Sequence, residues 1–209
     1  MNPKTDAPVE LIWIDTETTG LDTSRDLLLE LSVVLTDRFG EIVGSYEHVI
    51  SPPRSALRRM KELEQATSGP DAYVYEMHER SGLWEEVLHA MIPAPEIEKR
   101  ILDWFDSLHL DMGTFPLCGN TIWFDRLILR NRMPALENWF HYRNIDISSI
   151  KELTKLLAPD LHDRWKNITD SITKPHRAME DVLYSIKEYQ HYLQEDFITI
   201  TLPTGAHDA

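Results

Sequence analysis

The sequence contains no long hydrophobic run, and this absence limits where the protein can act. No stretch approaches the roughly 20 consecutive apolar residues that a membrane-spanning helix needs. Residues 1–10 also lack the apolar centre of a secretory signal peptide. The single cysteine, Cys118, has no partner for an intrachain disulfide, which agrees with a reducing compartment. We therefore expect a cytoplasmic protein without a membrane partner.

Positive charge is also scarce. The chain has 21 Lys and Arg residues against 35 Asp and Glu residues, a formal net charge of -14. Long nucleic acids bind largely through many Lys and Arg contacts to phosphates, so this composition argues against a protein that wraps a long strand. A few local cations or bound metal ions can still hold one or two phosphates. A short anionic substrate is therefore compatible with the composition.

The chain has no internal repeat and no low-complexity linker, so its 209 residues suggest one α/β domain. We expect this domain at residues 10–196, between a flexible N-terminus at 1–9 and a C-terminal tail at 197–209. Apolar patterning and turn residues predict strands at 11–15, 27–36, 42–50, 117–118 and 144–147. They predict helices at 57–65, from 83, and at 96–108, 123–132, 148–157 and 176–194, with loops at 67–71 and 159–175.

Two carboxylates stand at the end of the first expected strand. Asp15 and Glu17 are two positions apart, so strand geometry points both side chains to the same face. Two like charges on one face repel, and a divalent cation with oxygen ligands is a common reason for such a pair. The plainer alternative is a strand that runs into a charged turn.

Further acidic residues occur near strand ends or on the inner side of helices: Asp125, Asp146 and Asp181. His176 precedes Asp181 by five positions, which on a helix would leave the two side chains about 140 degrees apart. We therefore place His176 in the loop or first turn before the last helix, outside the metal ligands. This position suits a general base better than a ligand.

Five segments in this order resemble a known family, namely residues 12–22, residues 77–83, residues 118–121 with Asp125, residues 140–153 and residues 176–181. They are similar to the DEDDh branch of the 3′-to-5′ exonucleases and, within it, to the oligoribonucleases. The resemblance covers about residues 10 to 194. It implies a ribonuclease H-like fold, a three-layer α/β/α arrangement with a mixed central five-stranded sheet.

The resemblance also implies a mechanism. Asp15, Glu17, Asp125 and Asp181 match the four acidic residues that hold two divalent cations, Mg²⁺ or Mn²⁺, in such enzymes. The two ions clamp the attacking water and the leaving 3′ oxygen of an in-line displacement. His176 matches the general base, since an imidazole can accept a proton near neutral pH. The implied activity removes 5′-mononucleotides from the 3′ end of short RNAs, down to dinucleotides, in a homodimer.

Eight side chains match substrate contacts of this family: Leu21, Tyr73, His78, Thr121, Tyr142, Arg143, Ser148 and Lys151. By resemblance, Leu21 wedges against a base with His78 stacked nearby, while Tyr142 and Arg143 reach the site from a second subunit. Ser148 and Lys151 would cap the far phosphate, which closes the groove to longer chains. Tyr142 and Arg143 could instead be a surface aromatic beside a salt-bridged arginine.

The chain departs from the family pattern around Glu17. Thr16 and Thr18 stand where oligoribonucleases usually have Leu and Met. The two threonines are instead typical of related exonucleases that act on longer strands. Tyr73 replaces a usual tryptophan but can still stack on a base, and Thr121 keeps the hydroxyl of the commoner serine. One alternative is therefore a DEDDh exonuclease for longer single-stranded DNA or RNA. Another is a non-catalytic nucleotide-binding module with the same fold.

Two features have more than one interpretation. Asp146 either supports the metal ligands from behind or caps the helix that follows it. Residues 51–72 are longer than the family pattern, and this segment contains four cations: Arg54, Arg58, Arg59 and Lys61. These cations either contact the substrate or form a solvated helix face.

Overall fold

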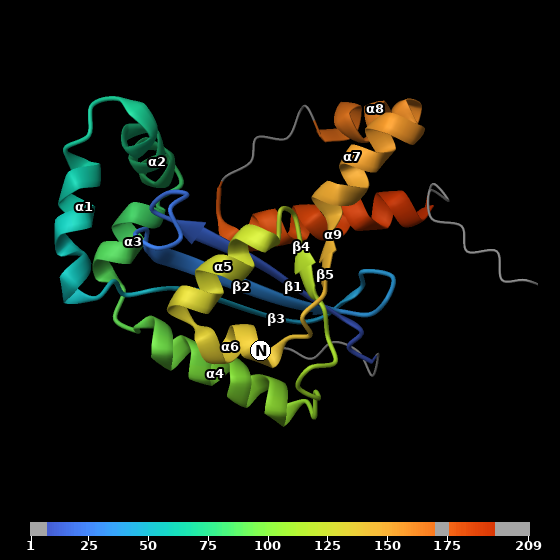
Figure 1. Ribbon diagram of the computed structural model, residues 1–209, viewed down its shortest axis with the longest axis horizontal. Coiled ribbons are helices and arrows are strands. Elements are labelled where there is room, and N and C mark those ends of the chain that lie inside the picture. The colour runs from blue at the N-terminus through green and yellow to red at the C-terminus, as the bar shows by residue number, and fades with distance from the viewer. Residues whose placement is uncertain (1–7, 170–175, 195–209) are drawn as a thin grey trace, which may run out of the picture.

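The computed structural model describes residues 8–169 and 176–194, in which one mixed five-stranded sheet carries helices on both faces (Figure 1). The strand order is β3 (Ile42–Val49), β2 (Leu28–Thr36), β1 (Leu11–Thr18), β4 (Leu117–Gly119) and β5 (Asn144–Asp146). β2 pairs antiparallel with both β3 and β1, whereas β4 pairs parallel with β1 and β5 pairs parallel with β4. Residues 197–209 and residues 1–7 of the expected N-terminal segment lie outside the described residues.

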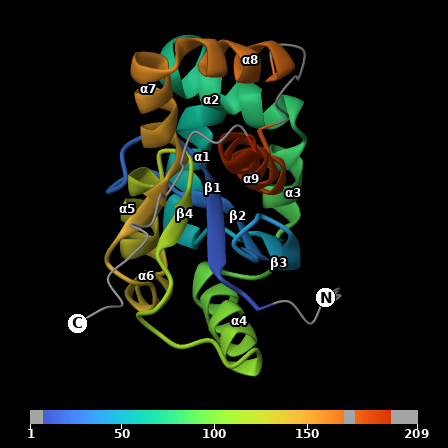
Figure 2. The same ribbon diagram turned by 90° about the vertical axis from the view of Figure 1, so that its right-hand side faces the viewer.

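The two faces of β1 point into different parts of the core. Ile12 and Ile14 pack with α4 (Ala94–Ser107), α5 (Trp123–Arg132) and α6 (Pro134–Trp139). Leu11 and Trp13 pack on the other face with α7 (Ile147–Leu157), α8 (Pro159–Thr169) and α9 (Ala178–Gln194). Figure 2 shows α5 and α6 on one side of β1 and α9 on the other. This arrangement confirms the three-layer α/β/α fold with a mixed central sheet.

A third apolar cluster lies at one end of the sheet, where α1 (Leu57–Glu64), α2 (Gly69–Arg80) and α3 (Leu83–His89) gather (Figure 1). Met60, Leu63 and Trp84 pack there against Leu27, which precedes β2, and Leu29, which is the second residue of β2. A short 3₁₀ turn at Arg54–Ala56 leads into α1. These helices therefore stand next to the loop that joins β1 to β2.

Three helices were absent from the sequence-based expectation. The expected loop at 67–71 contains the start of α2, and α8 occupies 159–169 of the expected loop at 159–175, whose last six residues lie outside the described part. The third is α6. Each of the three has a proline in its first turn: Pro70, Pro134 or Pro159. Proline breaks a helix interior but is well tolerated in the first turn, where no backbone N–H bond is lost.

Within the two described ranges, none of the helices has both the length and the apolar character that crossing a membrane would require.

Candidate active site

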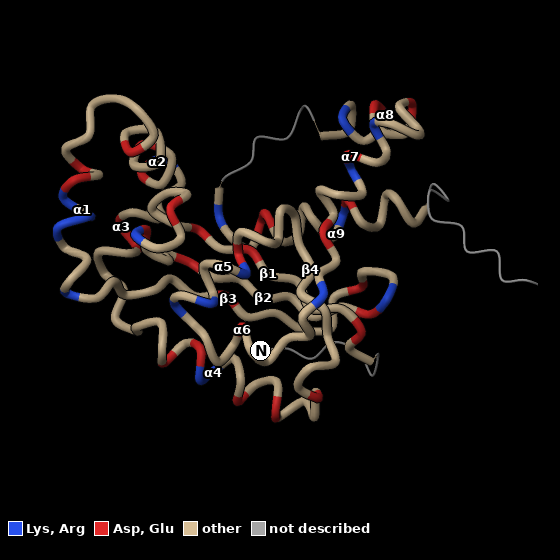
Figure 3. The backbone as a smooth tube through the Cα atoms, viewed as in Figure 1, with Lys and Arg blue, Asp and Glu red and all other residues tan. Residues whose placement is uncertain are grey.

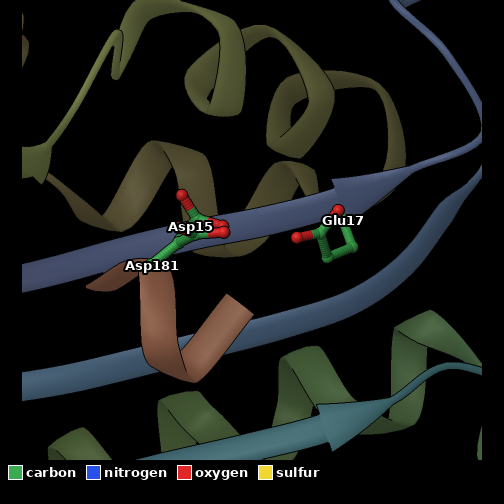
Figure 4. Close-up of side chains that lie close together, drawn as sticks. All are labelled: Asp15, Glu17 and Asp181. Carbon is green, nitrogen blue, oxygen red and sulfur yellow. The ribbon is translucent and has the colours of Figure 1, made fainter. Parts of the chain in front are cut away.

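Three of the predicted metal ligands meet where β1 passes under α9. Asp15, Glu17 and Asp181 each offer an oxygen, and these atoms lie within 4.8 Å of one another (Figure 4). Asp15 and Glu17 are on the same face of β1 as Trp13, which is the face that α9 covers. Asp181 is in the first turn of α9. Hard oxygen donors in this number suit Mg²⁺ or Mn²⁺, so the donor set fits a divalent cation.

The fourth predicted ligand, Asp125, reaches β1 from a different direction. It lies in the first turn of α5, is 5% exposed, and accepts a 2.6 Å hydrogen bond from the hydroxyl of Thr16. Asp125 is not one of the three residues whose oxygens lie within 4.8 Å of one another. Its charge is nevertheless near enough to raise the pKa of Glu17. The structure therefore brings Asp125 beside the cluster rather than into it.

Without a bound cation, burial and mutual repulsion disfavour the ionised form of these carboxylates. The pKa of Glu17 is raised to about 8, first by burial and then by the charges of Asp181, Glu30 and Asp125. Burial likewise raises the pKa of Asp125 to about 7, and the hydrogen bond from Thr16 opposes this rise. A bound divalent cation would favour the ionised form of both groups.

His176 lies in the loop immediately before α9, which confirms its expected position outside the helix. Its backbone is in the left-handed region, with φ of 52°, a conformation that costs a non-glycine residue roughly 1 kcal/mol or more. The next residue, Arg177, donates to both Glu30 on β2 and Glu86 on α3. The amide of Ala178 also donates to Glu30 at 3.0 Å. These bonds hold the backbone next to His176.

The structure corrects the stacking role expected for His78. Its ring is fully buried, so neither face is available for a base to stack on. The Nε2 atom lies 2.8 Å from the carbonyl oxygen of Thr18, which can only accept, so Nε2 is the donor. The Nδ1 atom lies 4.0 Å from Glu17, and burial lowers the pKa of His78. His78 is therefore a neutral ring packed behind Glu17.

An apolar pocket of about 610 Å³ opens beside the acidic cluster. Its lining includes Leu21, Tyr73, Met77 and Phe124, together with Glu17. Leu21 is 84% exposed and Tyr73 is 58% exposed, so both side chains are accessible to a ligand. The structure thus brings Leu21 and Tyr73, two of the predicted substrate contacts, to one cavity next to Glu17. Aromatic and aliphatic walls of this kind suit a flat nucleobase.

The predicted phosphate contact Ser148 lies at the start of α7. Its hydroxyl lies 2.9 Å from the amide nitrogen and 3.0 Å from the hydroxyl of Thr121, and 3.1 Å from the side-chain oxygen of Asn120. Asp146 accepts from the amides of Ser148 and Thr121, both at 3.0 Å, and so caps α7. Of the two interpretations of Asp146, the structure therefore supports the helix cap. Ser148 and Thr121 are brought together.

Lys151 is held by a residue that the sequence analysis did not identify. Its Nζ atom lies 3.0 Å from the fully buried carboxylate of Glu188 on α9, which also accepts from the hydroxyl of Tyr192 at 2.9 Å. Glu188 follows Asp181 by seven positions, which places both on nearly the same side of the helix. That spacing is the signal in the sequence that could have identified Glu188.

Tyr142 and Arg143 lie in the segment between α6 and β5, and both are exposed. The Tyr142 side chain is 74% exposed, and the Arg143 guanidinium carbon lies 5.3 Å from the centre of its ring. The described part of the chain brings neither residue into the pocket or the acidic cluster.

Comparisons with known proteins agree on the kind of protein. The RNase_T family model, described as an exonuclease, matches residues 12–189. An oligoribonuclease of Xylella fastidiosa is 36% identical over 191 residues, which are 91% of each chain.

Solved structures show the same fold at low sequence identity. Exonuclease I from Methylocaldum szegediense has a TM-score of 0.65 and 18% identity over 91% of this chain, which spans only 42% of that protein. The Mg²⁺- and Mn²⁺-bound form of Pop2p from S. pombe has a TM-score of 0.63 and 12% identity, covering 90% of this chain and 84% of that one.

Proposed function

Because the chain belongs to the oligoribonuclease family of exonucleases, we propose that it is a hydrolase that removes 5′-mononucleotides from the 3′ end of short RNAs, down to dinucleotides. The observation that carries this proposal is the meeting of Asp15, Glu17 and Asp181 within 4.8 Å, with Asp125 beside them. Three carboxylates at one point, with a fourth beside them, are difficult to explain without a cationic ligand.

We propose Asp15, Glu17, Asp125 and Asp181 as the ligands of two divalent cations, Mg²⁺ or Mn²⁺. When bound, the ions would orient the scissile phosphate and stabilise charge on the entering and leaving oxygens. His176 would accept the proton of the attacking water, because it stands next to the first turn of α9 that carries Asp181. Its backbone is held from the C-terminal side by Arg177.

The rest of the site would hold the two ends of a short substrate. Leu21 and Tyr73 would contact a base in the apolar pocket, and Ser148, Thr121 and Lys151 would hold the far phosphate. Ser148 and Thr121 are hydrogen-bonded to each other, which supports their acting together. A site that ends at a phosphate contact favours short chains over long ones.

We further propose that residues 10–196 act as one domain, in the cytoplasm, as a homodimer. In that dimer Tyr142 and Arg143 would reach the partner's site. The exposure of Tyr142 supports this role, because an aromatic ring that is 74% exposed in the monomer is available to a second subunit.

The length of the preferred substrate tests the proposal. Purified protein with Mn²⁺ is given end-labelled RNAs from two to about 20 nucleotides, and we expect the dinucleotide to be cleaved with the highest kcat/KM. Comparable cleavage of the longest strand would support the alternative of an exonuclease for longer single-stranded DNA or RNA, which the threonines beside Glu17 favour. If Asp15→Ala left hydrolysis unchanged, the two-metal mechanism would be wrong.

A pair of lysine variants isolates the phosphate contact. Lys151→Ala should lower kcat/KM for the dinucleotide by about tenfold, the scale of one charge-assisted contact, with little effect on longer RNA. Lys155→Ala is the matched control, because Lys155 lies on the same helix and pairs with Glu152. Equal behaviour of the two variants would remove Lys151 from the phosphate site.

A further inference from the structure

Residues 51–72 contain one buried cation, Arg59. Arg59 on α1 is only 7% exposed, whereas the side chain of its neighbour Arg58 is 91% exposed and pairs with Glu62. Figure 3 shows Lys and Arg positions along α1, at the end of the molecule where α2 stands beside it. Arg59 therefore corresponds to neither earlier interpretation of this segment, since a buried guanidinium is not part of a solvated face.

The guanidinium of Arg59 connects two separate segments of the chain. Its Nη1 and Nη2 atoms donate to the two oxygens of Asp71 on α2, at 2.5 and 2.8 Å. Its Nε atom donates to Asp26 at 3.0 Å, and Nη2 also donates to the carbonyl oxygen of Thr19 at 3.1 Å. Thr19 and Asp26 belong to the loop between β1 and β2. Arg59 thus fastens α2 to that loop.

Asp26 in turn determines the shape of the loop that carries Leu21. It is 1% exposed and accepts from the hydroxyl of Thr19 at 3.1 Å and the amide of Asp22 at 3.0 Å. The backbone of Gly20 passes so close that a Cβ atom there would lie 2.4 Å from an Asp26 oxygen. The position of Leu21 is therefore coupled to the carboxylate that Arg59 holds.

The two fastened segments are the two walls of the apolar pocket. Leu21 and Asp26 line one wall, while Asp71, Tyr73 and Met77 from α2 line the other. We propose that Arg59 is a positioning residue that sets the spacing between these walls, and thereby the fit of a nucleobase between Leu21 and Tyr73. The proposal rests on the proposed function, because it assigns the pocket to a base of the substrate.

Only an arginine can make this set of contacts. The planar fork binds both oxygens of Asp71 while Nε remains directed at Asp26. A lysine would keep the charge but offer one ammonium group in place of three separated nitrogen donors. We therefore expect Arg59→Lys to lose most of the positioning of the two walls, because the positive charge alone does not replace the lost contacts.

The experiment compares a substrate that has bases with one that has none. We measure kcat and KM of wild type, Arg59→Met, Arg59→Lys and the control Arg58→Met on a dinucleotide and on a base-free ester, the same dinucleotide backbone without its two bases, with Mn²⁺. Arg59→Met should raise KM for the dinucleotide by about tenfold or more, because small displacements of a binding wall are costly. Rates on the base-free ester should stay within about twofold of wild type, since the acidic cluster is untouched.

A second measurement tests the fastening itself, independently of activity. Hydrogen exchange should become faster in residues 19–26 and in the first turns of α2 in Arg59→Met, but not in α4. If Arg59→Met does not fold, Asp71→Asn breaks the same fork from a partly exposed position and should show the same changes.

The outcomes separate this inference from the proposed function. Unchanged exchange in both segments, or an equal loss of activity on both substrates, would overturn the role of Arg59. A wild-type protein that cleaves the base-free ester but not the dinucleotide would overturn the proposed function instead, while faster exchange in the variant would still support the fastening.

Discussion

The hydroxyl of Thr16 donates a 2.6 Å hydrogen bond to Asp125, a residue 109 positions further along the chain. Because alternate residues of β1 point to opposite faces, Thr16 faces α5 while Asp15 and Glu17 face α9. One strand thus orients acidic groups on both of its sides. A leucine at this position could not make the bond, so the contact depends on the threonine hydroxyl.

Removing the Thr16 hydroxyl should weaken metal binding at neutral pH. The hydrogen bond opposes the rise in the pKa of Asp125, so Thr16→Val should raise that pKa further above about 7. A cation must then displace a proton, and we expect about tenfold weaker Mn²⁺ affinity at pH 7, measured by calorimetry. The difference should shrink at pH 9. Thr18→Val is the control, because Thr18 donates to Gly20 rather than to a carboxylate; equal affinities in both variants would contradict the prediction.

The metal-free protein should lose stability as the pH rises. The folded-state pKa of Glu17 is about 8, above the value near 4.3 of an unfolded-state carboxyl, so the folded protein binds more protons between these values. The stability that this raised pKa of Glu17 gives the folded state is fully present below about pH 4 and is lost as the pH rises through about 8. The melting temperature in EDTA should therefore fall more steeply between pH 5 and 9 for wild type than for Glu17→Gln. Parallel slopes would refute the prediction.

Added Mn²⁺ should reverse this trend. Binding needs ionised carboxylates, so the stabilisation by saturating Mn²⁺ should be larger at pH 8.5 than at pH 6. We expect a rise of about 5 to 10 °C at the higher pH, for a concentration about 100 times the dissociation constant. Thermal unfolding of wild type and Asp181→Asn with and without Mn²⁺ provides the measurement. A rise of the same size in Asp181→Asn would place the ion elsewhere.

Arg177 should affect turnover rather than substrate binding. It bonds Glu30 and Glu86 and is the neighbour of His176, whose backbone is in the left-handed region. Arg177→Met should release that conformation and lower kcat for the dinucleotide by about tenfold or more, with KM nearly unchanged. Glu86→Gln, which removes only the half-exposed partner, should have a smaller effect. A rise in KM at constant kcat would show that Arg177 contacts substrate instead.

Mixed dimers test whether Arg143 acts on the partner's site. Two inactive variants, His176→Ala and Arg143→Ala, are unfolded together and refolded as a mixture. Half of the dimers are then mixed, and each mixed dimer has one complete site if Arg143 acts across the interface, giving about a quarter of the wild-type rate. No recovery in a confirmed dimer, or a monomer by light scattering that still cleaves dinucleotides, would exclude the role in trans.

The sequence predicted the parts of the site that depend on local geometry. Asp15 and Glu17 share a face because strand residues alternate. The position of His176 before α9 was predictable because its spacing from Asp181 does not fit one helix face. The expected strands β1, β2 and β3 were confirmed for the same reason. Short-range periodicity is a direct consequence of backbone geometry.

The contacts that the sequence did not reveal join residues far apart in the chain. Arg59 looked like a surface cation because its partner Asp26 is 33 positions away, and no local pattern connects them. Glu188 was not identified from the sequence, although it lies fully buried against Lys151. His78 was expected to face a ligand, but packing behind Glu17 encloses it. Burial of a polar side chain depends on tertiary packing, which periodicity does not encode.

The spacing of two acidic residues on α9 ties the proposed substrate length to helical pitch. Asp181 and Glu188 are seven positions apart, so they are nearly aligned and about 10 Å apart along the axis. Insertion of a single residue between them would turn Glu188 by about 100 degrees and withdraw it from Lys151. Only additions of nearly whole turns would preserve both contacts. Evolution or design toward a longer substrate could therefore proceed along this helix in discrete steps of about 5 Å, the length of one helical turn, rather than by gradual lengthening.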